Sequence, residues 1–279
     1  MFLLINSCVA KVFIIFTKKQ HMKYLLLLIS LLSFKGFSQS YIDYYFNSNG
    51  IKGAIVIYNT NTQQWVFNNE SEAYTNSPAA SHFHLWQTLV GLEEKVLNSS
   101  PTVIYKWDGI KRSYFGDRKN EWNKDMNLIE ALKSKNDFFF NQLKTSLNQN
   151  SYQSNIKNSS LLKQVASDDE YFWNYSGLTN PNTMIMFFKD LYEEKLSFNK
   201  KSQEFLKNQL ALDSSLLLNT STTSYQGKKI TWTVGVYLKQ DKPIYFSYRT
   251  YYYLDEELSD QYHLKRNKVL SEIFQALNL

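Results

Sequence analysis

The chain has 279 residues, with 31 Lys and Arg against 25 Asp and Glu, for a formal net charge of +6, and it has one cysteine. A single cysteine excludes a disulfide framework within the chain. That cysteine, Cys8, lies in a segment that we expect to be removed. The mature protein would therefore have neither a cysteine nucleophile nor a cysteine that could carry a lipid anchor.

The first 38 residues have the pattern of a secretory signal. Met22 and Lys23 precede an apolar run from Tyr24 to Leu32, and small residues follow. We expect cleavage after Ser38 and interpret residues 1–21 as an overcalled start. Removing residues 1–38 deletes five lysines and no acids, so the net charge falls from +6 to +1. The charge of the mature protein gives no indication of a nucleic-acid partner, which requires a basic stripe on the folded domain.

Residues 39–279, about 240 in number, are enough for one domain with a substantial core. Residues 51–58 and 63–67 are β-branched or aromatic runs separated by Asn59-Thr60-Asn61-Thr62, and they predict a β-hairpin. Ser77-Pro78 then predicts the start of a helix, with apolar residues at helical spacing from Phe83 onward.

Further helices are predicted by their N-terminal signals. Asn127 and Glu130 resemble a capping box that opens a helix through about Leu147, and Asn180-Pro181 opens one through Glu194. A last helix is expected from about Leu264 to Leu277.

Between the last two helices, the apolar period becomes two. Residues 222–225, 230–238 and 244–250 predict three antiparallel strands, with a turn at Gln226-Gly227-Lys228. Strands near both ends and helices between them predict one antiparallel sheet with a helical insertion, an α/β (α+β) fold.

Several motifs, taken in order, carry a resemblance to a known family. They are Ala80-Ser81-His82-Phe83, Thr88-Leu89-Val90-Gly91-Leu92-Glu93, Lys106 to Ser113, Trp122-Asn123-Lys124-Asp125, Phe172-Trp173 and Trp232-Thr233-Val234-Gly235. In this order they resemble the class D serine β-lactamases and, more broadly, the penicillin-recognising serine acyl-transferases. The resemblance runs from Ile51 to the C-terminus. It implies the serine β-lactamase/transpeptidase-like fold: an antiparallel sheet flanked by helices, plus a helical subdomain.

The resemblance implies that Ser81 is the nucleophile, in the first turn of a helix whose N-terminus favours negative charge. The family has a lysine three residues later, in the motif S-x-x-K, and here that position holds His84. A neutral imidazole can take a proton from a serine. His84 is therefore either a working base or a packed polar residue, and no acidic residue near it in the sequence is an obvious partner.

Other positions of the family's motifs also differ. The S-x-V motif falls on Lys135-Asn136-Asp137, and K-T-G aligns best with Thr222-Thr223-Ser224, followed by an aromatic residue, Tyr225. The Y-G-N loop is represented at most by Tyr152-Gln153-Ser154. The family's carboxylate-binding arginine matches Arg266. Lys135 is either a substitute for the missing lysine or a surface residue, and Arg266 is either a carboxylate-binding residue or a solvated one.

Two functions follow from the resemblance. In the first, Ser81 is acylated by a β-lactam or an acyl-D-Ala-type substrate. His84 or Lys135 takes the proton, the N–H groups of Ser81 and about Tyr225 hold the oxyanion, and product release is slow. In the second, a catalytically inactive relative binds peptidoglycan fragments or a protein. Either would act in the periplasm, without a stable membrane anchor after signal cleavage.

We expect no cofactor and no metal. His82 and His84 form an H-x-H pair, but residues two apart on a helix point to different faces.

Overall fold

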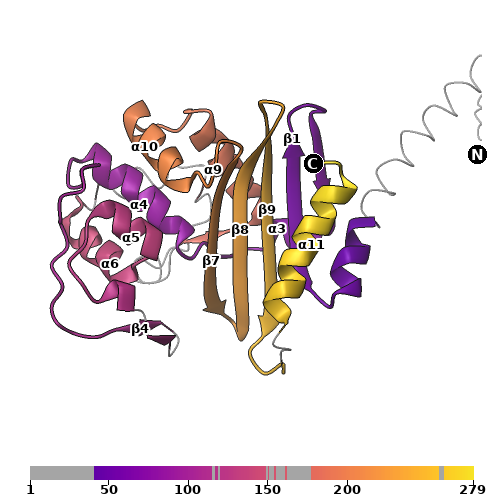
Figure 1. The fold of residues 1–279 in the computed structure, drawn as a ribbon, viewed down its shortest axis with the longest axis horizontal. Helices are drawn as coiled ribbons and strands as arrows, with labels where there is room; N and C mark the ends of the chain where they lie inside the picture. The colour runs from indigo at the N-terminus through magenta and orange to yellow at the C-terminus, as the bar shows by residue number, and fades with distance from the viewer. Residues whose placement is uncertain are drawn as a thin grey trace, which may run out of the picture.

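The computed structural model of the protein describes residues 41–114, 117–118, 120–148, 150, 154, 161, 177–257 and 261–279 (Figure 1). Its centre is a five-stranded antiparallel sheet with the order β2-β1-β9-β8-β7. The strands are β1 (Lys52–Asn59), β2 (Gln64–Phe67), β7 (Leu216–Tyr225), β8 (Lys228–Lys239) and β9 (Lys242–Tyr253). The expectation of one sheet built from both ends of the domain is confirmed.

The described helices lie on both faces of this sheet and beside its edge strand β7 (Figure 1). They are α3 (Glu70–Tyr74), α4 (His82–Glu93), α5 (Leu128–Ser134), α6 (Asp137–Ser146), α9 (Pro181–Tyr192), α10 (Lys200–Leu210) and α11 (Tyr262–Ala276). Residues 41–48 are also helical, and η1 (Asn120–Trp122) is a short 3-10 helix. Two-residue strands pair as β3 (Ser77–Pro78) with β6 (Leu178–Thr179) and as β4 (Ser113–Tyr114) with β5 (Asp117–Arg118).

Each strand contributes alternate side chains to two cores, as the period of two requires. On β8, Trp232 and Val234 belong to the larger core, which includes side chains of α4 and α9. On β1, Ile55 and Ile57 belong to the smaller core under α11 and the helix at residues 41–48. The sheet therefore separates an α11 face from an α4 face, and a residue's place in a strand decides to which face it belongs.

Two glycines permit close approach within the sheet. A Cβ on Gly53, whose φ is +143°, would lie 2.1 Å from the carbonyl oxygen of Arg249, and one on Gly235 would lie 2.4 Å from that of Leu217. Any side chain at either position would push neighbouring strands apart. This explains the glycine in the motif Trp232-Thr233-Val234-Gly235.

Three boundaries differ from the sequence-based expectation. Strand β7 begins at Leu216, whereas the sequence predicts that the strand begins at Thr222. Ser77-Pro78 does not begin a helix. It forms β3, in agreement with the extended conformation favoured before proline, and α4 begins at His82. The helix expected from Asn127 to about Leu147 is two helices. The Asn127 and Glu130 capping box is present, but Lys135 adopts a left-handed conformation (φ 52°, ψ 49°) and ends α5.

Some expectations fall outside the described residues. They include the export signal at residues 1–38, Phe172-Trp173, and Tyr152 and Gln153 of the loop motif. Within the described ranges, no helix is long and apolar enough to cross a membrane.

Candidate active site

Ser81 lies immediately before the first residue of α4, at the N-cap position. Serine is common there because its hydroxyl usually accepts a hydrogen bond from an N–H in the first turn. In this chain the Ser81 hydroxyl makes no such bond. Its Oγ is buried and has no hydrogen-bond partner among the described residues. Helix capping therefore does not account for this serine.

The backbone that leads into Ser81 is strained. Ala80 has φ +52°, a left-handed conformation that is unfavourable for a residue with a Cβ. The turn is held by hydrogen bonds from Ala79 N to Gly177 O (3.1 Å) and from His82 N to Ala79 O (3.2 Å). Such conformations persist only where the surroundings impose them, and they are frequent at functional sites.

His82 connects the start of α4 to strand β7. Its ring is fully buried, with Nε2 3.3 Å from the carbonyl oxygen of Asn219 and Nδ1 2.7 Å from Ser221 Oγ. Nδ1 also lies 3.1 Å from the carbonyl oxygen of Ala79, so each ring nitrogen has at least one hydrogen-bond partner. Burial, together with the charge of Lys135, lowers the pKa of His82 to about 3. His82 is therefore a neutral residue that holds β7 against α4.

His84 faces helix α6 instead. Its Nε2 lies 3.1 Å from Asp137 Oδ1, and its ring stacks on Phe140 with a centroid distance of 4.1 Å and an interplanar angle of 11°. Its other nitrogen, Nδ1, is buried and has no hydrogen-bond partner in the described part of the chain. The acidic partner that the sequence near His84 did not offer is thus supplied by the first residue of α6.

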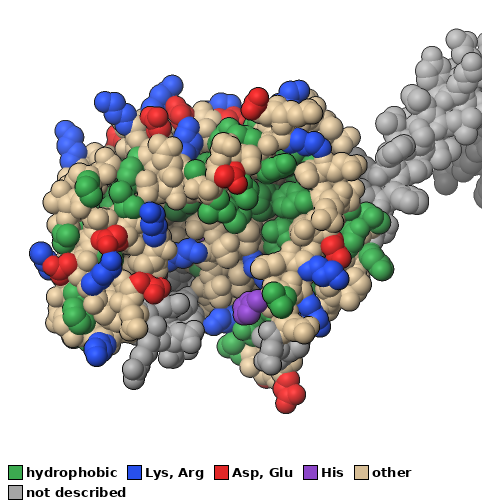
Figure 2. All heavy atoms as spheres, viewed as in Figure 1, with side chains coloured by type: hydrophobic (Ala, Val, Ile, Leu, Met, Phe, Trp, Pro, Cys, Tyr) green, Lys and Arg blue, Asp and Glu red, His purple; other side chains and the backbone are tan. Residues whose placement is uncertain are grey.

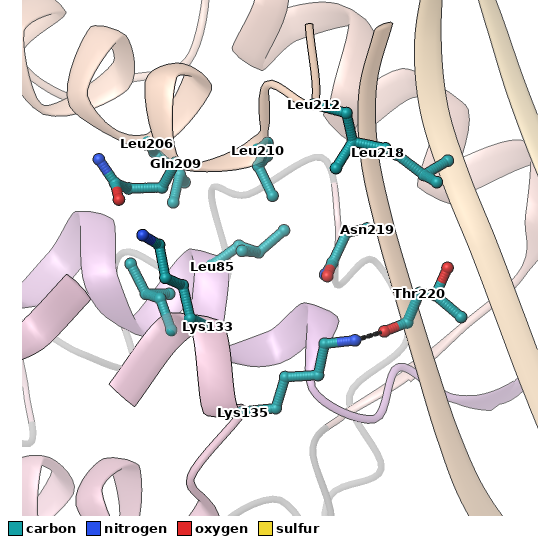
Figure 3. A pocket seen from close by; sticks show the side chains of 11 residues that line it. Leu85, Lys133, Lys135, Leu206, Gln209, Leu210, Leu212, Leu218, Asn219 and Thr220 are labelled. Atoms are coloured by element: carbon teal, nitrogen blue, oxygen red, sulfur yellow. Dashed lines mark hydrogen bonds between the residues drawn. The ribbon is translucent and has the colours of Figure 1, made fainter. Parts of the chain in front are cut away.

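Lys135 projects from the end of α5 toward the edge of the sheet. Its Nζ donates a hydrogen bond to the carbonyl oxygen of Thr220 on β7 (Figure 3). The sequence left two interpretations of Lys135, a substitute for the missing lysine or a surface residue. This contact favours the first, because a solvated surface lysine would not reach a strand of the sheet. Whether Lys135 takes part in chemistry stays a prediction.

The predicted K-T-G strand residues divide between the two faces of the sheet. Thr222 Oγ1 lies 3.3 Å from Thr231 Oγ1. Tyr225 packs partly buried against the α4-side core. By the alternation of a strand, Thr223 and Tyr225 share the face of Ser221, and Thr222 lies on the other.

Arg266 lies on the α11 face. The residue is buried. Its guanidinium donates hydrogen bonds from Nε to Thr250 Oγ1 (3.0 Å), from Nη1 to Asn267 Oδ1 (3.2 Å) and from Nη2 to Thr233 Oγ1. Thr233 lies between Trp232 and Val234, which both belong to the α4-side core, so it faces away from His82. The structure does not bring Arg266 into contact with the start of α4, and its role as a carboxylate-binding residue stays a prediction.

A cavity of about 260 Å³ lies between α4, α5, α10 and β7 (Figure 3). Its lining is largely leucine, with two lysines and a few uncharged polar groups: Leu85, Leu132, Lys133, Lys135, Leu206, Gln209, Leu210, Leu212, Leu218, Asn219 and Thr220. Figure 2 shows apolar side chains gathered over the upper part of the sheet between α10 and α11. Leu212, a residue that is 65% exposed, also lines the cavity.

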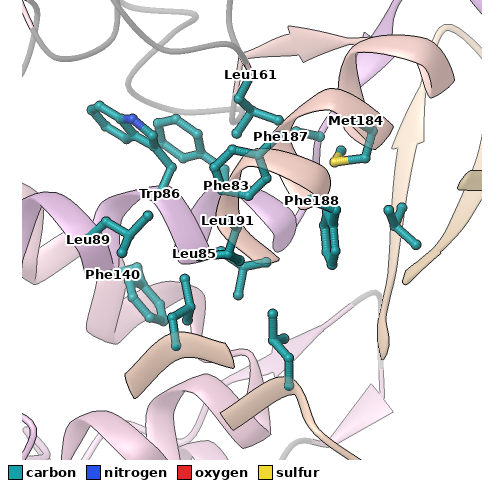
Figure 4. Close-up of a cluster of buried hydrophobic side chains, with 14 of the residues drawn as sticks. Phe83, Leu85, Trp86, Leu89, Phe140, Leu161, Met184, Phe187, Phe188 and Leu191 are labelled. Atoms are coloured by element: carbon teal, nitrogen blue, oxygen red, sulfur yellow. The ribbon is translucent and has the colours of Figure 1, made fainter. Parts of the chain in front are cut away.

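The helix that carries Ser81 and His84 rests on a dense apolar cluster (Figure 4). Phe83 stacks on Trp86 with a centroid distance of 5.6 Å, and the His82 ring meets Phe188 edge-on at 6.0 Å. The residues labelled in the figure are Phe83, Leu85, Trp86, Leu89, Phe140, Leu161, Met184, Phe187, Phe188 and Leu191. Because this packing is tight, the positions of His82 and His84 are set by the core and not by the site alone.

No group of three or more His, Cys, Asp or Glu side chains lies close enough to hold a metal ion in the part of the chain that the structure describes. Sequence reasoning missed two residues that shape the site, His82 as the contact to β7 and Asp137 as the partner of His84. A signal for Asp137 was present: Asn136-Asp137 is a typical start of a helix. The Asn136 side chain accepts hydrogen bonds from Phe138 N and Phe139 N at the start of α6.

The chain is similar in sequence to known proteins. Regulatory protein BlaR1 of Bacillus licheniformis is 22% identical over 220 residues, which are 76% of this chain and 36% of BlaR1. β-Lactamase OXA-48 of Klebsiella pneumoniae is 25% identical over 214 residues, which are 72% of this chain and 76% of OXA-48. The resemblance to the class D β-lactamases is confirmed. No family model matches the sequence.

Solved structures agree with these relatives. The class D β-lactamase of Sebaldella termitidis superposes with a TM-score of 0.74 at 26% identity, covering 85% of this chain and 95% of that one. The C-terminal domain of the Bacillus licheniformis BlaR penicillin-receptor has a TM-score of 0.69 at 19% identity and covers 84% and 94%. The chain thus has the class D β-lactamase fold. It spans only about a third of the length of BlaR1.

Proposed function

We propose that this chain is a penicillin-binding protein of the class D β-lactamase type, in which Ser81 is acylated by a β-lactam and the acyl group is released slowly. The relatives support this class, since they include both a class D β-lactamase and a penicillin-receptor. The observation that carries the proposal is the state of Ser81. Its hydroxyl is buried, takes no part in capping and follows a strained residue.

The surrounding groups have roles in this reaction. The N-terminus of α4 provides backbone N–H groups and a positive potential for an oxyanion on the attacked carbonyl. His84, three residues along the same helix, is the group that takes the proton of Ser81. The backbone N–H of about Tyr225, on β7, is the predicted second donor to the oxyanion.

For the carboxylate of the substrate, the geometry favours Lys135 over Arg266. The amine of Lys135 lies at the edge of β7 beside Thr220, next to the strand that His82 holds against α4. The guanidinium of Arg266 is already bonded to three side chains on the α11 face. A substrate carboxylate can pair with a lysine at a strand edge without displacing a buried network.

Slow release follows from the residue at the position of the family's lysine. In the class D family that lysine is carboxylated, and the carboxylated lysine is the base for deacylation. The imidazole of His84 cannot be carboxylated in the way that a lysine amine is. We therefore expect an acyl-enzyme that outlives the acylation step, as in a penicillin-binding protein or a receptor.

Intact-protein mass spectrometry after incubation with a penicillin tests this proposal. Because opening of a β-lactam ring releases nothing, acylation adds the whole mass of the compound. We expect the adduct on the wild type and not on Ser81→Ala. Ser202→Ala is a matched control, since Ser202 also lies in the first turn of a helix, α10. An adduct that persists on Ser81→Ala, or the absence of any adduct on folded wild type, would contradict the proposal.

A second function, binding without chemistry, is favoured by the number of replaced positions. The motif lysine at position 84, the serine at position 135 and the K-T-G lysine are all absent. Loss of members of a mutually dependent catalytic set costs several orders of magnitude in rate. In that case a peptidoglycan fragment would bind and the same mass measurement would give no adduct with any β-lactam.

We also propose that residues 1–38 are an export signal and that the remaining domain acts in the periplasm. The apolar run after Lys23 and the extracytoplasmic setting of class D β-lactamases support this. The mass of the protein recovered after expression of the full chain tests it, and a mature form that begins at residue 39 is expected. Retention of residues 22–38 in the recovered protein would contradict it.

A further inference from the structure

The His84 ring is held by two contacts that come from one helix. Asp137, the first residue of α6, meets Nε2 at 3.1 Å, and Phe140, one turn later, stacks on the ring. The place of Asp137 is itself fixed by the break between α5 and α6. Asn136 is fully buried, its N–H bonds to Ala131 O (3.0 Å), and its side chain caps α6. The carboxylate is therefore presented to His84 by a hydrogen-bonded turn.

This contact decides which nitrogen of His84 carries the proton. A carboxylate only accepts hydrogen bonds, so the neutral ring places its proton on Nε2 and leaves a lone pair on Nδ1. Nδ1 is the buried nitrogen without a hydrogen-bond partner among the described residues, and Ser81 Oγ is a buried hydroxyl in the same condition, so no hydrogen bond joins these two atoms in this structure. Catalytic hydrogen bonds are often long in the absence of substrate and tighten when it binds. Buried polar atoms are normally paired, and two complementary exceptions three residues apart on one helix call for an explanation.

We propose that Asp137 is a positioning residue that sets the tautomer of His84, so that Nδ1 accepts the proton of Ser81. The inference rests on the proposed function and specifies how its base works. In this arrangement serine, histidine and aspartate form a relay on the class D fold, in place of a carboxylated lysine. The ring nitrogens exchange the roles they have in the Ser-His-Asp triad of serine proteases, where Nδ1 meets the aspartate.

The acylation step then balances as follows. Ser81 Oγ forms a bond to the lactam carbonyl carbon while its proton moves to His84 Nδ1, which gives an imidazolium paired with the Asp137 carboxylate. The lactam C–N bond breaks, and the His84 imidazolium gives its Nδ1 proton to the lactam nitrogen. The product is a Ser81 ester and a neutral His84.

The first test is the acylation rate by a penicillin in Asp137→Asn. The amide of asparagine can donate to Nε2, which favours the proton on Nδ1 and removes the acceptor. We expect acylation to slow by at least about 100-fold, in line with the large loss that the wrong histidine tautomer causes in serine proteases. Asp137→Glu, which keeps the charge, should recover part of the rate. Asp213→Asn, in an exposed turn before β7, is the control and should react like the wild type.

The second test separates positioning from a structural role. In a double-mutant cycle, adding Asp137→Asn to His84→Ala should have no further effect on acylation, because Asp137 acts through His84. Nitrogen-15 NMR of the His84 ring should show the proton on Nε2 in the wild type and on Nδ1 in Asp137→Asn. A wild-type His84 ring protonated on Nδ1 would overturn the inference, whatever the effect of Asp137→Asn on stability.

The two proposals fail in different ways. If the wild type forms no adduct, the proposed function is overturned, and this step with it. If the wild type is acylated and Asp137→Asn reacts equally fast, only the role of Asp137 is overturned and Ser81 remains the nucleophile.

Discussion

Two histidines on the first turn of α4 are placed in opposite ways. His82 faces the sheet, both its nitrogens have partners on β7, and its pKa is lowered to about 3. His84 faces α6, with one nitrogen on a carboxylate and the other buried without a partner in the described residues. Two positions on a helix differ by about 200°, so the same residue type meets a strand in one case and a helix in the other.

The hydrogen-bond partners of each histidine therefore indicate whether it has a structural or a chemical role. A histidine whose hydrogen-bonding capacity is fully used holds elements together and cannot accept another proton at neutral pH. A histidine that keeps one buried lone pair has capacity left for a reaction. The predictions below test whether the two residues really divide in this way.

The largest expected effect is the loss of acylation in His84→Gln. Glutamine keeps the bulk and polarity of the side chain but cannot act as a base, and removal of a general base costs about 10²–10⁴-fold in rate. Stopped-flow acylation by a penicillin measures the loss, and thermal unfolding controls for folding. A wild-type acylation rate in His84→Gln would contradict the role of His84 as a base, since both histidines would then be structural.

The next effect is on stability, in His82→Ala. This change removes a fully buried ring and its contacts to Asn219 and Ser221, so we expect a loss of about 3 kcal/mol in the free energy of unfolding. Urea denaturation measures it. His84→Gln is the matched comparison and should lose clearly less. If the two variants are equally stable, the sheet contact of His82 is not what holds β7 to α4.

The stability of the protein should also depend on pH through His82. The unfolded chain binds a proton at His82 near pH 6.5, whereas the folded pKa is about 3, so acid favours the unfolded state. The contribution of His82 is complete above pH 6.5 and decreases as the pH falls toward 3. The stability advantage of the wild type over His82→Gln should therefore narrow between pH 6.5 and 4.5. A constant difference across that range would show that burial does not hold His82 neutral.

The smallest effect is expected for Lys135→Met. If Lys135 pairs with the substrate carboxylate, its loss should weaken reaction with a penicillin by about tenfold, which corresponds to about 1.4 kcal/mol. The methyl ester of the same penicillin has no carboxylate, so it should react equally well with both proteins. A loss as large as that of His84→Gln, and equal for the ester, would instead make Lys135 the base.

Local signals in the sequence predicted the elements whose formation is a local matter. The capping box at Asn127 and Glu130 formed as expected, as did the helix after Asn180-Pro181 and the three C-terminal strands. Ser77-Pro78 misled because serine before proline is compatible with either a helix start or an extended strand. In the structure Ser77-Pro78 is extended because it pairs with Leu178–Thr179, which lie far along the chain.

What the sequence alone determined is the class of protein and the position of its candidate nucleophile, because ordered motifs and periodicity are properties of the chain itself. Tertiary structure alone decided which side chains meet. It placed Asp137 on His84, turned Lys135 inward at a left-handed break, and put Arg266 on the face of the sheet away from His82. Pairings of this kind depend on where a helix breaks and on which face of a strand a residue lies, and a shift of one residue reverses them.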